Sequence, residues 1–201
     1  GAANLLRHID NLKNGYGLPV CVAINAFPTD SAEEHAMLRE ICEGAGVPCA
    51  LSEVFAKGSE GGRELAEAVL GILREDTRVR YAYPDDACLP QKIEAVCKKV
   101  YRAAEVTYAP AAKKSLEEIA RMGYGGLPVC IAKTQYSFSD DAALLAAPEG
   151  FSMNVRDVRL SAGAGFVVAI MGAIMTMPGL PKKPAAESID LDENGRITGL
   201  F

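Results

Sequence analysis

Two phenylalanines stand where a parallel sheet could use them to bind a ligand. Phe27 comes two residues after the apolar run 19–25, and Phe55 comes three residues after the apolar run 47–52. Both runs are short and apolar, as buried strands are. Ligands of open parallel sheets bind beyond the carboxyl ends of the strands, and two aromatic faces there could hold a flat heterocycle between them. The residues alone leave open the alternative that each ring packs on its own helix.

A glycine-rich loop after Phe55 is a second candidate. Residues 57–62 read KGSEGG and lead into a predicted helix, where exposed backbone N–H groups and the helix dipole attract anions. The loop is not a Walker A loop, because no Gly-Lys-Ser or Gly-Lys-Thr follows, and the chain has no Gly-x-Gly-x-x-Gly. Lys57 and Gly58 are candidate cleft residues together with Asn25, although a plain connection would have the same composition.

The sequence predicts neither a metal site nor an identifiable catalytic group. The six cysteines form no Cys-x-x-Cys pair, and His8 and His35 sit in predicted amphipathic helices, so a zinc site is not expected. Residues 190–195 match the first half of a calcium-binding loop, but its twelfth position is Phe201 instead of Glu. No Gly-x-Ser-x-Gly motif occurs. Catalytic residues therefore stay unassigned.

The composition is typical of a folded cytoplasmic protein. The chain has 201 residues and a net charge of −5, which argues against a nucleic-acid partner. Cysteines within apolar runs predict buried free thiols in a reducing compartment. The uncharged stretch 161–181 is interrupted by glycine and proline, which favours buried strands and excludes a membrane-spanning helix. The helical start without an initiator Met suggests an excised piece of a longer protein.

Helices and strands are expected to alternate in the first half of the chain. A helix at 3–13, the strand 19–25, a helix with Asp30 as its N-cap, the strand 47–52 and a helix after residue 62 together predict a parallel sheet covered by helices. The last helix is expected to turn one apolar set inward: Leu65, Val69, Ile72 and Leu73.

The second half repeats this kind of composition after a polar stretch at 76–89. Helical spacing predicts helices at 93–101 and 111–122, apolar runs predict strands at 127–133, 151–160 and 166–171, and Asn194-Gly195 predicts a type I′ hairpin. The fold class is therefore α/β, with parallel and mixed sheets covered by helices. Two small α/β subdomains are expected, residues 1–86 and 87–201, the second ending in the β-hairpin.

Several colinear segments, considered together, resemble one protein family. They read VAINAFPTD, ALSEVFAKGSEGG, AKTQYSFSD, VRDVRLSAGAGF and IMTMPGLP, at residues 22–30, 50–62, 132–140, 155–166 and 174–181. In this order and spacing they resemble the C-terminal part of formate–tetrahydrofolate ligase. The resemblance covers essentially the whole chain.

The resemblance implies an ATP-dependent reaction that joins formate to N10 of tetrahydrofolate through formyl phosphate. The family holds the ATP phosphates in a large N-terminal domain, which this chain lacks, so the chain alone is expected to be inactive. ATP, tetrahydrofolate, the missing domain and further copies of the chain are the implied ligands and partners. The alternative is a non-catalytic module that folds, self-associates or binds folate.

Residue by residue, the resemblance places Phe27 and Phe55 on the two faces of the pterin. Leu51 and Ser52 match a strand end near the adenine. Relatives often have Trp where this chain has Phe55, and Arg where it has Ala26. The polar segment 133–141 receives no catalytic role from the resemblance and is interpreted as a surface for domain packing or oligomer contacts.

Overall fold

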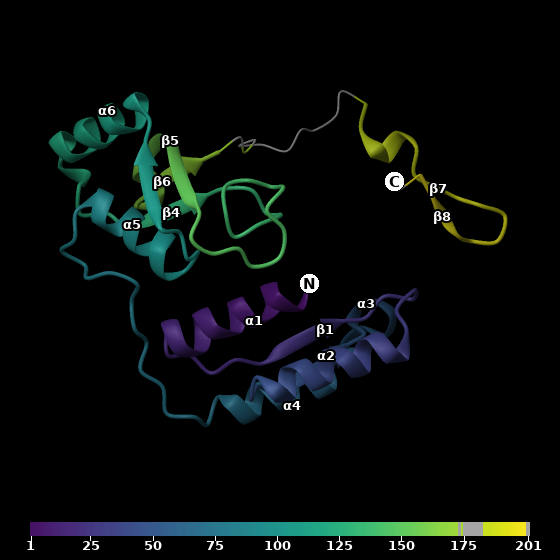
Figure 1. The fold of residues 1–201 in the computed structure, drawn as a ribbon. Coiled ribbons are helices and arrows are strands. Elements are labelled where there is room, and N and C mark those ends of the chain that lie inside the picture. Colours follow the sequence, from purple (N-terminus) through teal and green to yellow (C-terminus); the bar gives the residue numbers. More distant parts are fainter. Residues whose placement is uncertain (173, 175–182, 200–201) are drawn as a thin grey trace.

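The computed structural model describes residues 1–172, 174 and 183–199, and its first unit confirms the predicted α-β-α-β-α order. A short helix after β2 is an addition to that order (Figure 1). The elements are α1 (Ala2–Asp10) with a π-helical turn (Asn11–Gly15), β1 (Val22–Asn25), α2 (Ala32–Gly44), β2 (Cys49–Ser52), α3 (Val54–Lys57) with a 3₁₀ turn (Gly58–Gly62), and α4 (Arg63–Ile72).

Strands β1 and β2 pair in parallel, with Val22 opposite Cys49 and Asn25 opposite Ser52. A small core of Ile9, Cys42 and Val47 ties α1 and α2 to this pair. Because both strands run in the same direction and in register, their carboxyl ends meet at one edge.

Two details of the first unit differ from the sequence-based prediction. The N-cap of α2 is Ser31 and not Asp30, because the Ser31 hydroxyl accepts the Glu34 N–H at 3.1 Å and the Glu34 carboxylate accepts the Ser31 N–H at 2.8 Å. On α4, Val69 and Leu73 are exposed, so the inward apolar face is narrower than expected.

The cysteines are also less uniformly buried than expected. All six are free thiols, but Cys88 and Cys130 are exposed, and only Cys42 and Cys97 are fully buried. Cys130 lies on β4, where alternate residues point to opposite faces of the sheet, and Cys88 is the N-cap of α5.

The second unit contains a four-stranded mixed sheet, so the α/β class is confirmed. Its strand order is β3-β5-β6-β4, with β5 and β6 antiparallel and the two outer strands parallel to their neighbours. The elements are α5 (Leu89–Lys99), β3 (Glu105–Tyr108), α6 (Pro110–Ile119) with a π-helical turn (Ala120–Tyr124), β4 (Val129–Ala132), β5 (Ser152–Ser161), a 3₁₀ turn (Ala162–Ala164) and β6 (Phe166–Met171).

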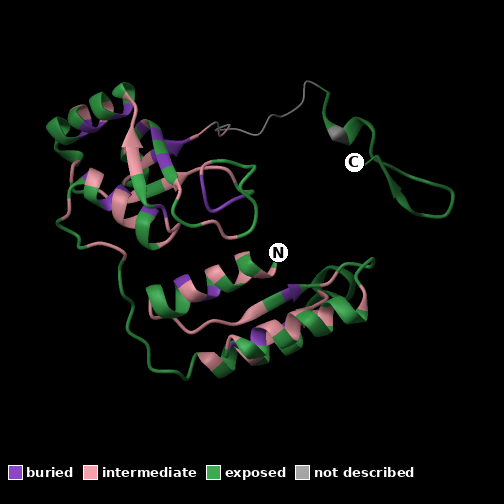
Figure 2. Ribbon diagram, in the orientation of Figure 1, coloured by how far each residue is buried: buried purple, intermediate pink, exposed green. Residues whose placement is uncertain are grey.

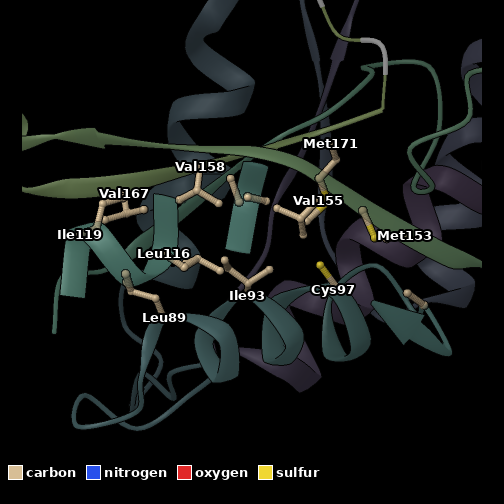
Figure 3. Close-up of a cluster of buried hydrophobic side chains, with 13 residues drawn as sticks. Leu89, Ile93, Cys97, Leu116, Ile119, Met153, Val155, Val158, Val167 and Met171 are labelled. Carbon is tan, nitrogen blue, oxygen red and sulfur yellow. The ribbon is translucent and has the colours of Figure 1, made fainter. Parts of the chain in front are cut away.

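Helices α5 and α6 pack on one face of this sheet and form the main core of the protein (Figure 3). Leu89, Ile93 and Cys97 come from α5 and meet Met153, Val155 and Val158 of β5. A β-bulge lies between Val155 and Asp157. The extra residue returns Val158 to the core face, which explains why the apolar alternation of this strand changes phase.

The C-terminal hairpin is confirmed, but its turn is not type I′. Strands β7 (Asp190–Leu191) and β8 (Ile197–Thr198) are antiparallel and exposed (Figure 2). Only Gly195 of the Asn194-Gly195 pair has a positive φ, +73°. Gly195 donates to the Asp192 carbonyl at 2.9 Å, which gives a longer turn with glycine at its left-handed position.

An extended connection at 73–88 separates the two units, at the place where the subdomain boundary was predicted. Nevertheless α1 contacts the second unit. The Asn11 side chain donates to the Val100 carbonyl at 3.0 Å, and Arg102 pairs with Asp10 at 2.6 Å. The division into residues 1–86 and 87–201 stays a prediction.

Of the uncharged stretch 161–181, the described part includes the end of β5 and all of β6, while 173 and 175–181 lie outside the described residues. Within the described residues, no helix combines the length and apolar composition needed to cross a bilayer.

Lys92 on α5 provides a test of how the second unit is held together. Its buried Nζ donates to the Gly126 carbonyl at 2.7 Å and lies 5.5 Å from the centre of the Tyr83 ring. We expect Lys92→Met to lower the free energy of unfolding by about 1–3 kcal/mol, because buried hydrogen bonds are lost. Urea denaturation measures this effect. Lys98→Met on the same helix removes only an exposed ion pair and is expected to change stability by less than about 1 kcal/mol. Equal effects would contradict the role given to Lys92.

Candidate functional site

The carboxyl edge of β1 and β2 brings the predicted site residues together. Asn25 and Ser52 end the two strands as paired neighbours, and the Ala26 N–H donates to the Ser52 carbonyl at 3.0 Å. This hydrogen bond joins the chain segments that leave the sheet toward Phe27 and Phe55. Leu51 and Ser52 are half-buried, while Asn25 is exposed at the same edge.

Phe27 is held by a tight turn that its backbone makes with Asp30. The Phe27 N–H donates to the Asp30 carboxylate at 2.8 Å, and the Asp30 N–H donates to the Phe27 carbonyl at 3.0 Å. The His35 ring lies 3.2 Å from the same carboxylate. The hydrogen bond from Phe27 and then the one from His35 lower the pKa of Asp30. The backbone at Phe27 is therefore fixed while its ring stays 60% exposed.

Phe55 lies on α3, and a backbone hydrogen bond holds the start of this short helix. The Glu53 N–H donates to the Gly61 carbonyl at 3.0 Å, so the glycine-rich segment folds back over the start of α3. A Cβ on Gly61 would meet the Glu53 carbonyl oxygen at 2.5 Å, so only glycine permits this approach. Gly58 has a φ of +60°, which also favours glycine.

Neither ring is buried against its own helix, as the alternative interpretation would require. Phe27 is 60% exposed and Phe55 is 93% exposed. Exposed aromatic faces beyond adjacent strand ends are what a stacking site requires.

Lys57 extends from the end of α3 at this edge, but its charge is already paired. Its Nζ lies 2.7 Å from the Glu53 carboxylate; the Lys57 side chain is exposed and the Glu53 side chain is partly exposed. An anion bound at the KGSEGG loop would compete with Glu53 for this ammonium group. The loop is therefore a weaker anion site than its composition suggests.

Sequence reasoning missed the Asp30–His35 pair, and with it a hollow beside β1. The hollow measures about 460 Å³ and is lined by Asn25, Asp30 and His35 together with apolar residues of α1 and α2. The available signal was an Asp three residues after Phe27, at the distance from which a carboxylate can accept that residue's N–H. Asp30 precedes α2 and His35 lies on it, five residues later. Helical periodicity therefore could not indicate that the two side chains are paired.

The segment 133–141 does not reach this edge. It follows β4 in the second unit, and its Phe138 is buried against His8 of α1, with ring centres 4.7 Å apart. It therefore packs the two units together, one of the two roles predicted for it. Among the described residues, no group of three His, Cys, Asp or Glu side chains is placed to hold a metal ion.

The turn at Phe27 is expected to depend on pH. Because the pKa of Asp30 is lowered in the folded protein, the charged carboxylate stabilises the turn above its ordinary pKa. This contribution is lost as the pH falls through the lowered pKa. NMR should show the Phe27 amide proton shifting with that titration. The shift should be absent in Asp30→Asn, and an unchanged titration in that variant would contradict the assignment.

A comparison with protein families gives a match over the full length of the chain. The model of the family described as formate–tetrahydrofolate ligase matches residues 1–201.

Proposed function

The chain belongs to the formate–tetrahydrofolate ligase family, and on that premise we propose that the edge beyond β1 and β2 binds the pterin of tetrahydrofolate between Phe27 and Phe55. The family is a ligase that uses ATP and tetrahydrofolate as substrates. The proposal rests on one observation. Phe27 and Phe55 are exposed, and they follow the carboxyl ends of β1 and β2, which pair in register.

The proposed role of the two rings is to bind and orient. A pterin is flat, so it can offer one face to each ring and exclude water from both. Stacking fixes the plane of the heterocycle and so restricts where the C9–N10 arm attached to it can lie. When N10 attacks the carbonyl carbon of formyl phosphate, the C–N bond forms, phosphate leaves and the amine gives up a proton. Orientation of this kind lowers the activation free energy, because the substrate has already lost rotational entropy on binding.

The remaining site residues have supporting roles in this proposal. Asn25 offers an exposed amide beside Phe27, and Leu51 with Ser52 forms the half-buried strand end near the adenine of ATP. Lys57 and Gly58 line the loop side of the cleft. Ala26 leaves the cleft without a cation at that position.

The proposal assigns folate binding to this chain and phosphate chemistry to a separate part of the ligase. The chain contains no Walker A sequence, so we expect no ATP-dependent turnover by the purified chain alone. Mixing it with the phosphate-binding domain of a family member should give formyltetrahydrofolate. Turnover by the chain alone would contradict this division of roles. Failure of the mixture, with both parts folded, would favour a module that binds folate without catalysis.

Calorimetric titration with tetrahydrofolate tests the stacking directly. Each of Phe27→Ala and Phe55→Ala should remove about 1 kcal/mol of stacking, which is about a fivefold loss of affinity. Tyr81→Ala is the control, because Tyr81 is 75% exposed on the connection between the units. Equal losses in all three variants, or in none, would contradict a pterin site at this edge.

Replacement of Phe55 by a larger ring should have the opposite effect. Phe55→Trp presents more aromatic surface from the same exposed position on α3, so tetrahydrofolate should bind more tightly. The same titration measures the gain, and the intrinsic fluorescence of the new indole should be quenched on binding. Binding that is weaker than in the parent chain would show that the ring is not a stacking surface.

A further inference from the structure

A second cavity lies between α1 and the loop after β4, and it shares no lining residue with the β1–β2 edge. Its volume is about 360 Å³, within the size range of small-molecule sites. The described residues that line it include no Asp or Glu. They include two basic groups, two amides and three phenyl or phenol rings: His8, Lys133, Asn4, Gln135, Tyr101, Tyr136 and Phe138.

Lys133 holds a positive charge at a fixed place in this cavity. Its Nζ donates to the Thr134 carbonyl at 3.0 Å and to the Ser137 carbonyl, and it lies 4.9 Å from the centre of the Tyr101 ring. Within the described residues, no carboxylate comes within 4.0 Å of this ammonium group. Burial lowers the pKa of Lys133, and the more distant charge of Asp140 partly offsets this effect.

His8 places a second basic group beside the first. Its ring is held against Phe138 at 4.7 Å, and its nitrogens have no hydrogen-bond partner among the described residues. Burial and then the charge of Lys133 lower the pKa of His8. Arg7, the residue before His8 on α1, lies 6.0 Å over the same Phe138 ring and pairs with Glu149 through one nitrogen. Its Nη1 is buried without a hydrogen-bond partner among the described residues.

Basic groups on different elements therefore gather around two neighbouring rings, with Arg7 and His8 at Phe138 and Lys133 at Tyr101. Like charges at close range raise the energy of the protonated forms, and an anion bound among them lowers it. A cavity of about 360 Å³ exceeds what a single inorganic ion fills. The rings of Tyr101 and Phe138 supply flat apolar walls, and burial raises the pKa of Tyr101 to about 12, so its hydroxyl stays neutral and can donate a hydrogen bond.

We propose that this cavity between α1 and the β4 loop binds a small aromatic carboxylate, with the carboxylate between Lys133 and His8 and the aromatic part against Tyr101 and Phe138. Asn4 and Gln135 are placed to hydrogen-bond its polar substituents. The site does not depend on the proposed role of Phe27 and Phe55. Its ligand can be a separate metabolite, or the aminobenzoyl-glutamate part of a folate, which has the same chemistry.

NMR of the two histidines provides the test, because His35 is an internal control. The probe is 4-aminobenzoylglutamate, and each imidazole is titrated with and without it. An anion beside His8 favours the protonated ring, so the probe should raise the pKa of His8. The His35 signals should not respond to the probe, because His35 lies beside Asp30 and does not line this cavity. The groups that face His8 are Lys133 from the β4 loop, Tyr101 after α5 and Arg7 on α1 itself.

Two variants separate a binding role from a structural one. His8→Phe keeps an aromatic ring against Phe138 but removes the base, so probe affinity should lose its dependence on pH in the range where His8 titrates. Lys133→Met should weaken probe binding about tenfold, because a charge-assisted contact is lost. Lys113→Met on the exposed surface of α6 is the matched control. If Lys133→Met unfolds the loop, His8→Phe and the titration of the parent chain still decide the proposal.

The outcomes separate this proposal from the pterin site. Probe binding that survives Phe27→Ala and Phe55→Ala, with a shift confined to His8, supports the cavity as a site. Tetrahydrofolate that also shifts His8 identifies the folate tail as one source of the ligand. If the probe, formate and phosphate each shifted the NMR titrations of both histidines equally, the cause would be ionic strength. That result would overturn the proposal. An unshifted His8 at saturating probe would overturn it as well.

Discussion

The in-register parallel pairing of β1 and β2 is the constraint on which the candidate site depends. A slip of one residue would turn alternate side chains to the opposite face and separate the ends of the strands. With Asn25 opposite Ser52, the two chain segments leave the sheet side by side. The rings that follow need no contact with each other, because the strands already place them at one edge. A turn at Asp30 and a glycine-dependent approach at Gly61 then fix the backbone on each side.

Helix α1 is the element through which the two units meet. Its Ile9 belongs to the small core of the first unit. His8 and Asp10, together with Asn11 of the turn that follows, contact the second unit. The main core, around α5, α6 and the four-stranded sheet, is larger and contains no residue of α1. The contacts between the units are thus mostly polar and aromatic, in contrast to the aliphatic core within the second unit.

Periodicity predicted most elements, because a helix and a half-buried strand repeat their apolar residues at different intervals. It correctly placed α2, β5 and β6, and it placed Phe27 and Phe55 at strand ends. It missed β3 and α3, because their sequences, EVTY and VFAK, lack the continuous apolar runs that marked the equally short strands β1, β2 and β4. The N-cap of α2 was placed one residue early, since Asp30 and Ser31 are both good caps and only the tertiary turn at Phe27 selects between them.

The site could be predicted in part, for a similar reason. Strand ends and aromatic residues can be recognised from sequence, and the family resemblance added roles for Leu51 and Ser52. The cavity at Lys133 could not be found in this way, because it brings together α1 and a loop that lies more than a hundred residues later. Its partners are adjacent only after both units have folded. The charge on Lys133 was therefore interpreted as part of a polar surface segment.

The close approach between Gly61 and Glu53 has a consequence for how this chain can vary during evolution. The position of Phe55 depends on a residue that neither touches a ligand nor belongs to the strands of the sheet. A substitution at residue 61 would push α3 outward, because a Cβ there would overlap the Glu53 carbonyl group. The aromatic face could thus be displaced by a mutation that leaves every contacting side chain intact. Genetic drift at this glycine would therefore displace the proposed stacking surface while leaving both rings unchanged.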